Sequence, residues 1–333
     1  MMKTEYCFAW WNLENLFDVE NVSYRPDWIN TKIRSELKGW GPEQLNLKLK
    51  QLAQVIVAMN DGRGPDLLGV CEVESSQVLK RLISTLHLPN RQYEVVHADN
   101  NDKRGIDVAF IYDRTFFSVE TEIDPDTGQS NDNVFHHVIQ KRSATRDIVQ
   151  VNFKTQQGRD FIVIGNHWPS RSGGELQSEP YRMMAGETLA YFMDRIKTLR
   201  GEIPVFVMGD FNDEPFNRSM TKYALSMNNL KKVKSTRAKN PYLFNLMWPL
   251  MDGSLGSHSF NGIWGMLDQM LVNRAGLASQ QLFTAPGNAE IMVFPGMVKG
   301  NKVIRHARPA RSSYNPKGYS DHLPLLLTVT EKH

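Results

Sequence analysis

The segment Val205-Phe206-Val207-Met208-Gly209-Asp210-Phe211-Asn212-Asp213-Glu214-Pro215 joins a short apolar run to an abrupt polar turn. Residues 205–208 are continuously hydrophobic and are bounded by turn residues, which predicts a buried strand. Gly209 frees the backbone where the strand ends, and Pro215 keeps the next segment out of a sheet. Asp210 and Asn212 are therefore expected at the carboxyl end of a strand, where open α/β sheets bind ligands. Because Asp and Asn also favour turns, this segment alone does not separate a turn from a functional site.

The composition is that of a folded globular protein. The 333 residues are 41% hydrophobic and 23% charged, which allows a large core, and the net charge of +3 names no partner. Cys7 and Cys71 lie in apolar runs, which excludes a disulfide scaffold and predicts buried free thiols. No apolar stretch approaches the ~20 residues of a membrane span. The chain enters a strand without a signal-peptide core, so a cytoplasmic location is the default expectation, although a removed signal would leave the same sequence.

Helix and strand patterns alternate along the whole chain. Helices are predicted over residues 43–59, 76–86 and 179–198. Strands are predicted over residues 8–13, 65–72, 93–97, 107–112, 134–138, 147–153, 161–165, 205–208, 267–272 and 323–330. Because no linker and no short repeat divides the chain, we expect one α/β domain over residues 1–333 with large mixed sheets.

Polar side chains lie at or next to one end of six of these strands. They are Asn12 with Glu14 and Asn15, Glu72 with Glu74, Asn166 with His167, Asp210 with Asn212, Asp268, and Asp321 with His322. Ligand sets rich in oxygen suit Mg²⁺ or Mn²⁺, and the lack of cysteine argues against structural zinc. Histidines beside carboxylates suit proton transfer and the stabilisation of a negatively charged transition state.

The same segments carry a family resemblance. They are Trp-Asn-Leu-Glu-Asn (11–15), Glu72, Gly-Asn-His-Trp-Pro-Ser (165–170), Gly-Asp-Phe-Asn (209–212), Leu-Asp-Gln-Met (267–270) and Ser-Asp-His-Leu-Pro (320–324). In this order they resemble the motif series of the endonuclease/exonuclease/phosphatase superfamily, which has the deoxyribonuclease I-like fold. The resemblance implies a four-layered α/β/β/α sandwich with two packed mixed sheets. It also implies hydrolysis of a phosphoester with Mg²⁺, or Mn²⁺ in its place, as cofactor.

The resemblance implies metal binding by three carboxylates. Glu72 matches the principal Mg²⁺ ligand of the family, and Asp321 matches a residue near the metal. Glu14 falls where some members have a second acidic ligand, although an exposed carboxylate is nearly as good an interpretation. Glu74 is the weaker match because Glu72 ends the buried run.

The resemblance also implies the catalytic roles. His167 matches the histidine that contacts the scissile phosphate and protonates the leaving oxygen. Asp210 and Asn212 match the pair that orients the water and contacts the phosphate. His322 matches the histidine that acts as base or stabilises the phosphorane-like state, and Asp268 matches its partner carboxylate. The sequence identifies no partner for His167 and does not say which group removes the proton from water.

Substrate contacts are expected from an amide and several arginines. Asn12 matches the amide that positions the phosphate and the metal. Five arginines could face the phosphate, with surface salt bridges as the alternative: Arg104, Arg142, Arg146, Arg171 and Arg182. Arg171 and Arg182 are preferred because they follow His167 closely, and Arg104 is a further candidate.

Two basic segments and one aromatic segment bear on the substrate class. Residues 291–319 hold six basic side chains and no acidic one: Lys299, Lys302, Arg305, Arg308, Arg311 and Lys317. This segment precedes the Ser-Asp-His motif, so it is expected to border the active site and attract a polyanion, unless it is a solvated loop. Residues 231–239 are also basic, but their place is not predicted. The aromatic residues Tyr242, Phe244, Trp248 and Phe260 could stack bases, but a satellite core under a long loop is preferred.

Three functions follow from this pattern. The favoured one is a divalent-metal-dependent nuclease that hydrolyses phosphodiester bonds within DNA, or RNA. The second is a phosphatase or phosphodiesterase of a small phosphorylated molecule, such as an inositol phosphate, a phospholipid head group or a nucleotide derivative. A membrane-inserting hairpin is not evident, which weakens the lipid version, and no obligate protein partner is evident. The third, an inactive binding module, is disfavoured because every expected chemical position is filled.

Overall fold

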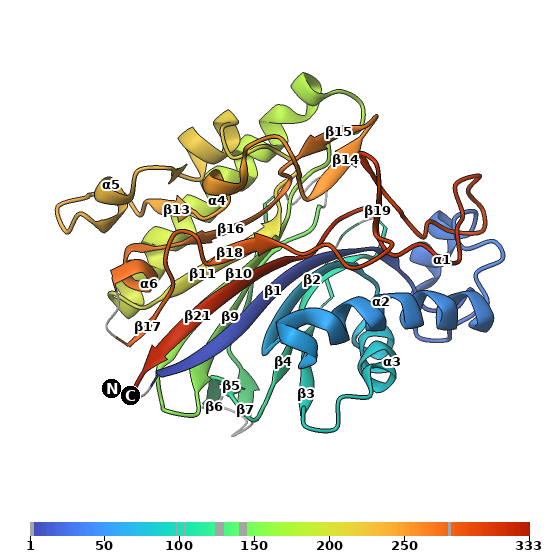
Figure 1. The fold of residues 1–333 in the computed structure, drawn as a ribbon, viewed down its shortest axis with the longest axis horizontal. Coiled ribbons are helices and arrows are strands. Elements are labelled where there is room, and N and C mark those ends of the chain that lie inside the picture. Colours follow the sequence, from blue (N-terminus) through green and yellow to red (C-terminus); the bar gives the residue numbers. More distant parts are fainter. Residues whose placement is uncertain are drawn as a thin grey trace.

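Two large β-sheets pack face to face in the computed structural model, which describes residues 3–97, 99, 100, 102, 104–123, 130–139, 145–278 and 281–333 (Figure 1). Helices cover the outer face of each sheet. The chain therefore has the α/β/β/α architecture that the motif series implied, and the predicted fold class is confirmed.

The first sheet contains both ends of the described chain. Its strand order is β17-β21-β1-β2-β4-β3, and β18 also pairs with β21. The strands are β1 (Lys3–Leu16), β2 (Leu67–Val73), β3 (Tyr93–His97), β4 (Asp107–Asp113), β17 (Leu282–Phe283), β18 (Ala289–Ile291) and β21 (Leu325–Lys332). β1 and β2 are parallel, whereas β21 runs antiparallel to β1, so the first and last strands lie side by side (Figure 1).

The second sheet is also mixed. Its order is β12-β13-β16-β11-β10-β9-β5, and β8 also pairs with β9. The strands are β5 (Phe117–Val119), β8 (Val134–His137), β9 (Ile148–Thr155), β10 (Asp160–His167), β11 (Val205–Asp210), β12 (Ser226–Met227), β13 (Leu243–Asn245) and β16 (Asp268–Val272). β10 and β11 are parallel, and β16 runs antiparallel to β11, which places Asp268 opposite Asp210.

Three long helices cover the sheets. α2 (Pro42–Gly62) and α3 (Ser76–Leu86) pack on the first sheet, and α4 (Glu175–Arg200) packs on the second. The smaller elements are α1 (Asp27–Ile33), α5 (Leu230–Lys234), α6 (Arg274–Ala278), a π-helical turn (Ser219–Tyr223), a 3-10 turn (Trp248–Leu250) and the hairpins β6 (Thr121–Ile123) with β7 (Ser130–Asp132), β14 (His258–Phe260) with β15 (Ile263–Gly265) and β19 (Val298–Lys299) with β20 (Lys302–Val303).

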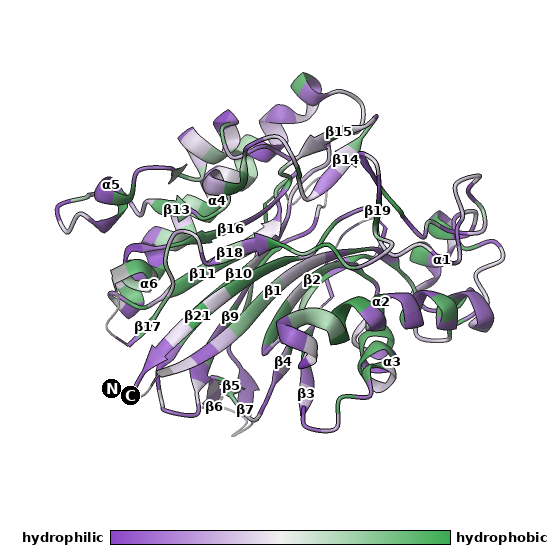
Figure 2. Cartoon of the chain, in the orientation of Figure 1, coloured by the Kyte–Doolittle hydropathy of each residue, from purple (hydrophilic) through white to green (hydrophobic). Residues whose placement is uncertain are grey.

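The core follows from the alternation of side chains along each strand. In β1, Phe8 and Trp10 face the layer between the sheets, whereas Ala9 and Trp11 face the helices. Phe8 contacts Phe206 of the second sheet with ring centroids 5.3 Å apart. Figure 2 shows hydrophobic residues along the central parts of the strands. Burial of such side chains contributes about 1.5–3 kcal/mol each and fixes the distance between the sheets.

Strand direction brings the polar strand ends together. Because β1 and β2 are parallel, and β10 and β11 are parallel, the carboxyl ends of each pair lie at one edge of their sheet. β16 begins at that edge of the second sheet, and the loop before β21 arrives at that edge of the first. All six polar segments therefore converge at these two adjacent edges of the sheets.

The predicted elements correspond closely to the observed ones. The three predicted helices are α2, α3 and α4, and each of the ten predicted strands has a counterpart in the two sheets. Strands of two or three residues, such as β14 and β15, were not predicted because they are too short to show an alternating pattern. Cys7 and Cys71 are free thiols as predicted, although Cys7 is only half-buried. No helix in the described ranges is both long and apolar enough to cross a membrane.

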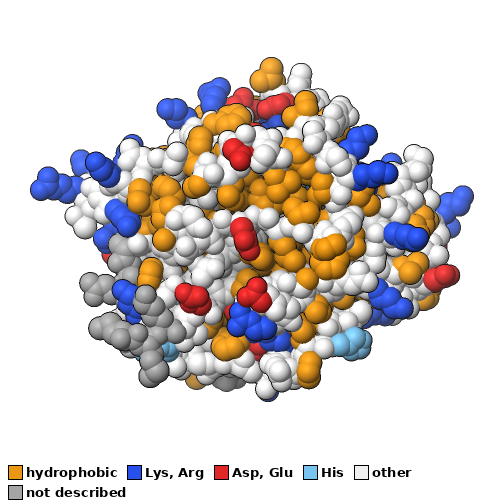
Figure 3. Space-filling model, in the orientation of Figure 1, with side chains coloured by type: hydrophobic (Ala, Val, Ile, Leu, Met, Phe, Trp, Pro, Cys, Tyr) orange, Lys and Arg blue, Asp and Glu red, His pale blue; other side chains and the backbone are white. Residues whose placement is uncertain are grey.

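The basic and aromatic segments have separate locations. Residues 231–239 lie around α5, which contacts α6 beyond the Val272 end of β16 and not the Asp268 end. Lys and Arg side chains project at the left edge of Figure 3, over α5. In the aromatic segment, Phe244 is buried in the core, whereas Phe260 is 70% exposed at the β14–β15 hairpin. Phe244 therefore belongs to the main core between the sheets and not to a satellite core, and Phe260 belongs to no core.

Candidate active site

The backbone is irregular where β1 and β2 end. Asn12 pairs with Cys71 and Leu16 with Val73, so β1 advances four residues where β2 advances two. Glu14, Asn15 and Glu72 have φ angles of 54°, 53° and 60°, and Asn212 after β11 has a φ of 51°. Non-glycine residues seldom adopt this left-handed region, and residues held in it cluster at functional sites.

Asp210 lies at the centre of the converging polar side chains. Its Oδ2 accepts a hydrogen bond from Asn12 Nδ2 at 3.2 Å and lies 3.7 Å from His167 Nε2 and 3.9 Å from His322 Nε2. Its Oδ1 accepts the backbone N–H of Asn212 at 3.0 Å. Burial raises the pKa of Asp210 to about 7, and the charge of His322 opposes this rise. Asp210 therefore has a proton affinity suited to exchange near neutral pH.

His322 and Asp268 form a buried imidazole–carboxylate pair. His322 Nδ1 lies 2.6 Å from Asp268 Oδ2, and Trp10 Nε1 donates to the other carboxylate oxygen at 3.0 Å. Trp11 Nε1 donates to the backbone carbonyl of His322 at 2.8 Å. Burial opposes a charged ring, but Asp268 and Asp210 outweigh it and hold the pKa of His322 well above its usual value. The ring is therefore an imidazolium whose Nε2–H faces the site.

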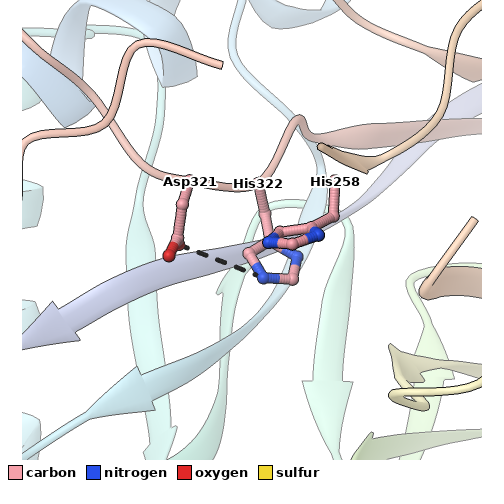
Figure 4. A group of neighbouring side chains, drawn as sticks. All are labelled: His258, Asp321 and His322. Carbon is pink, nitrogen blue, oxygen red and sulfur yellow. Dashed lines mark ion pairs between the residues drawn. The ribbon is translucent and has the colours of Figure 1, made fainter. Parts of the chain in front are cut away.

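His258 covers the other side of this imidazolium (Figure 4). It comes from β14, and its ring centroid lies 4.7 Å from that of His322. Burial and, after it, the charge of His322 together lower the pKa of His258 to about 4, so His258 is neutral. Asp321 lies on the same rim, with Oδ1 4.0 Å from His322 Nε2 and Oδ2 3.1 Å from Arg305 Nη2. Burial of Asp321 would raise its pKa, but His322 and Arg305 outweigh this and lower it.

His167 is a further histidine of the site and, unlike His322, it is neutral. Its Nε2 lies 3.7 Å from both Glu72 Oε1 and Asp210 Oδ2, whereas its Nδ1 has no hydrogen-bond partner in the described part of the chain. Burial lowers the pKa of His167 well below its usual value, and Arg146 and Arg104 lower it further. The site thus combines one imidazolium, His322, with two neutral imidazoles, His167 and His258, and Asp210 lies between His167 and His322.

Glu72 offers an open carboxylate oxygen. Its Oε2 accepts the backbone N–H of Asn15 at 2.9 Å. Its Oε1 accepts no hydrogen bond from any described residue; His167 Nε2 lies 3.7 Å away and Arg104 Nη2 lies 3.9 Å away. The side chain is 13% exposed, so the oxygen is reachable from the site. A reachable carboxylate oxygen without a hydrogen bond fits a Mg²⁺ ion, which is bound through one or two carboxylates plus substrate phosphates.

Two groups of acidic and histidine side chains at the site are compact enough to hold a metal ion. They are His258 with Asp321 and His322, and Asp210 with Asp268 and His322. In the second group, however, Asp268 and His322 already bind each other, which suits proton handling better than metal binding. Glu72 therefore fits a metal ion better than that group.

Glu14 does not offer a comparable oxygen. Arg305 Nε donates to it at 2.7 Å, and the backbone N–H groups of His306 and Ala307 donate at 3.1 Å each. Its side chain is 2% exposed. Glu14 thus holds the segment around Arg305, and because both of its oxygens accept hydrogen bonds it is a poorer metal ligand than the sequence predicted. Glu74 is likewise bound by Arg25 and is not at the site.

Arg104 and Arg146 lie beside the site, whereas Arg171 holds a loop next to it. Arg104 is half-exposed beside Glu72. Arg146 is buried, donates from Nη2 to the Trp168 carbonyl at 2.8 Å, and lies close enough to lower the pKa of His167. Arg171 donates from Nε to the Asn212 carbonyl at 2.7 Å, so it positions that loop.

The preference for Arg182 over Arg146 is corrected by the structure. Arg182 is completely buried under α4, with Nε 2.8 Å from Asp213 Oδ1, and it does not reach the site. Arg142 lies outside the described residues. His258 carries no recognisable signal in the sequence because its strand is short. The hydrogen bond from Trp10 to Asp268 was also not predicted, because the two residues are far apart in the chain.

Comparisons with known proteins agree with this geometry. Residues 7–331 match the model of the Endonuclease/Exonuclease/phosphatase family, so the chain belongs to that family. It is a phosphoesterase of this superfamily, with the deoxyribonuclease I-like fold. A search of curated proteins found no significant match.

Solved structures share the fold over nearly the whole chain. The human Nocturnin catalytic domain with bound sulfate is 17% identical at a TM-score of 0.55, covering 98% of this chain and 94% of that one. A mannosyl-6-phosphatase from Bacteroides thetaiotaomicron is 17% identical at a TM-score of 0.52, and the match covers 97% of this chain and 98% of that one. D. rerio TDP2 complexed with a single-strand DNA product is 11% identical at a TM-score of 0.57, and the match covers 98% of this chain and 99% of that one. At these identities the likeness concerns the fold.

Proposed function

We propose that this protein is a divalent-metal-dependent nuclease that cleaves phosphodiester bonds within DNA. The observation that carries the proposal is that His167 Nε2 and His322 Nε2 both lie within 4 Å of Asp210 Oδ2, beside the open oxygen of Glu72. Both sheets supply these residues, so we further propose that residues 1–333 act as one catalytic unit.

The charge states suggest how the side chains divide the chemistry. Asp210 orients the attacking water and accepts its proton, since burial has raised its pKa. The imidazolium of His322, held by Asp268, stabilises the negative charge that develops on the phosphate. His167 Nε2, between Glu72 and Asp210, contacts the phosphate as a neutral imidazole. Paired groups with pKa values displaced in opposite directions are the usual basis of such a division.

A divalent cation would be held by Glu72, and Asp321 lies on the other side of the site. The cation, Mg²⁺ or Mn²⁺, would supply a positive charge against the phosphate oxygens. Asn12 and Asn212 flank Asp210 and fix its position. Arg146 and Arg104 add positive charge on the Glu72 side.

Two features favour a polynucleotide over a small molecule. The basic segment before β21 lies against the site through Arg305, which contacts Asp321 and Glu14. The exposed ring of Phe260 lies on the hairpin that carries His258, and such a ring can stack on a base. A phosphatase of a small phosphorylated molecule is the second candidate, because a structural neighbour is a mannosyl-6-phosphatase.

Plasmid nicking with Mg²⁺, with Mn²⁺ and with EDTA tests the proposal against release of phosphate from sugar and inositol phosphates. We expect nicking that EDTA abolishes. The variant Glu72→Gln should lose activity and weaken Mn²⁺ binding in calorimetry, whereas Glu187→Gln, an exposed change on α4, should behave as wild type. Phosphate release without nicking would favour the second candidate. Equal activity of Glu72→Gln and Glu187→Gln would exclude the metal-ligand role.

A further inference from the structure

A separate cavity adjoins the proposed catalytic centre. It has a volume of about 230 Å³ and is lined by Asn15, Arg305, Arg308, Arg311 and Ser313, with Glu14 and Ala307. Pockets for whole drug-sized ligands occupy about 300–1,000 Å³, so this one suits a single chemical group. Its lining is dominated by guanidinium groups, which favours an anion.

The cavity is physically joined to the catalytic centre. The backbone N–H of Asn15, on its wall, donates to Glu72 Oε2 at 2.9 Å. Arg305, on the same wall, lies 3.1 Å from Asp321 Oδ2. A substrate bound at the centre can therefore extend directly into the cavity.

Positive charge is in excess in the cavity. Glu14 is already neutralised by Arg305 and by two backbone N–H groups. A single carboxylate, Glu36, pairs with both Arg308 and Arg311, at 2.5 Å for Arg308 Nη2. Each guanidinium has five N–H donors in a rigid fork, so one shared carboxylate leaves donors for a ligand.

Arg308 is also held in place before any ligand arrives. Its guanidinium lies 5.6 Å from the centroid of the Phe17 ring, and its side chain is only 13% exposed. A guanidinium fixed by an aromatic face and a carboxylate loses little conformational entropy on binding. The cavity is thus preorganised for an oxyanion.

We propose that this cavity binds a second phosphate group of the substrate, next to the one that is hydrolysed. The inference rests on the proposed phosphoester hydrolysis and narrows it to substrates with at least two phosphates. The second phosphate is either the neighbouring internal phosphate of a strand or a terminal phosphate.

Relative activity on three substrates tests this. They are bis(p-nitrophenyl) phosphate, which has one phosphate, and a short oligonucleotide with and without a 5′-phosphate. In Arg308→Gln and Arg311→Gln, the ratio of kcat/KM on either oligonucleotide to that on bis(p-nitrophenyl) phosphate should fall about tenfold, for a loss of ~1.4 kcal/mol. A fall for the 5′-phosphorylated oligonucleotide alone would assign the cavity to a terminal phosphate. The matched control is Lys317→Gln, which removes a charge from the same segment outside the cavity.

The outcomes separate the two proposals. An unchanged ratio, or the same change in Lys317→Gln, would overturn the phosphate assignment while leaving hydrolysis intact. If the wild type hydrolyses none of the substrates, the proposed function fails, and calorimetry with inorganic phosphate then decides the cavity alone. In that titration, binding that is at least tenfold weaker in Arg308→Gln than in Lys317→Gln supports the cavity, and equal binding excludes it.

Discussion

Asp268 holds His322 through one carboxylate oxygen while Trp10 occupies the other, so the acidic partner of the imidazolium has no freedom to rotate. The pair joins β16 of one sheet to the loop before β21 of the other, and Trp10 reaches it from β1. The separation between the sheets, set by aromatic packing, therefore also sets the geometry of the pair.

Asp268→Asn should lower kcat by up to about 10⁴-fold, the loss seen when the carboxylate of such a pair becomes an amide. Because Asp268 helps to raise the pKa of His322, its loss lowers that pKa. Activity that needs the imidazolium is present below this pKa and lost above it, so the alkaline decline of kcat/KM should begin at lower pH. Trp10→Phe, which keeps the His322–Asp268 contact, should show a smaller loss, and an alkaline decline unchanged in Asp268→Asn would refute the role.

Asp210 should set the acidic decline of activity. Its pKa is raised to about 7, chiefly by burial. A group that must be a carboxylate to accept a proton is active above its pKa and inactive below it, so kcat/KM should fall as the pH drops through about 7. The measurement is a pH profile of kcat/KM with circular dichroism at each pH, so that acid unfolding is recognised. A flat profile with an intact fold would show that Asp210 is not the proton acceptor.

The sequence predicted the architecture and most of the site for a clear physical reason. Strand ends are read from local hydrophobic runs, and Asp210, Asp268 and His322 each lie at or near one end of such a run. Contacts that depend on which way a side chain points are not local. Arg182 follows His167 closely in the chain, but the rotation of α4 directs it under the helix toward Asp213. Proximity in sequence therefore gave the wrong arginine.

The residues that the sequence did not predict come from weak or distant elements. His258 lies on a three-residue strand with no recognisable period, and it meets His322 only because β14 forms an isolated bridge with that segment. Arg146 was among five arginines but was not preferred, because Arg171 and Arg182 follow His167 more closely in the sequence. Its position in the fold depends on a hydrogen bond to the Trp168 carbonyl. Contacts such as those of His258 and Arg146 depend on how segments that are far apart in the sequence are placed against each other in the fold.

Arg182 should matter for stability and not for substrate binding. Removal of one partner of a buried ion pair leaves an uncompensated charge, so Arg182→Met should lower the free energy of unfolding by about 3–5 kcal/mol. Denaturant titration measures this loss. The folded fraction should keep the wild-type KM, whereas Arg104→Met at the site should raise KM and leave stability nearly unchanged. A raised KM in Arg182→Met without loss of stability would restore the substrate role.

Phe260 should contribute to the binding of a strand without contributing to the fold. Its side chain lies two residues from His258 on β14, so the two point to the same face of that strand, and it pairs with the exposed Ile263 across the hairpin. Stacking of one base on an aromatic ring is worth about 1–3 kcal/mol, so Phe260→Ala should raise the Kd for single-stranded DNA by roughly 5-fold to 150-fold. Leu199→Ala, an equally exposed change on α4, is the matched control, and fluorescence anisotropy measures both. Equal DNA affinity of the two variants, with unchanged unfolding, would place the bases elsewhere and leave the hairpin without a role in binding.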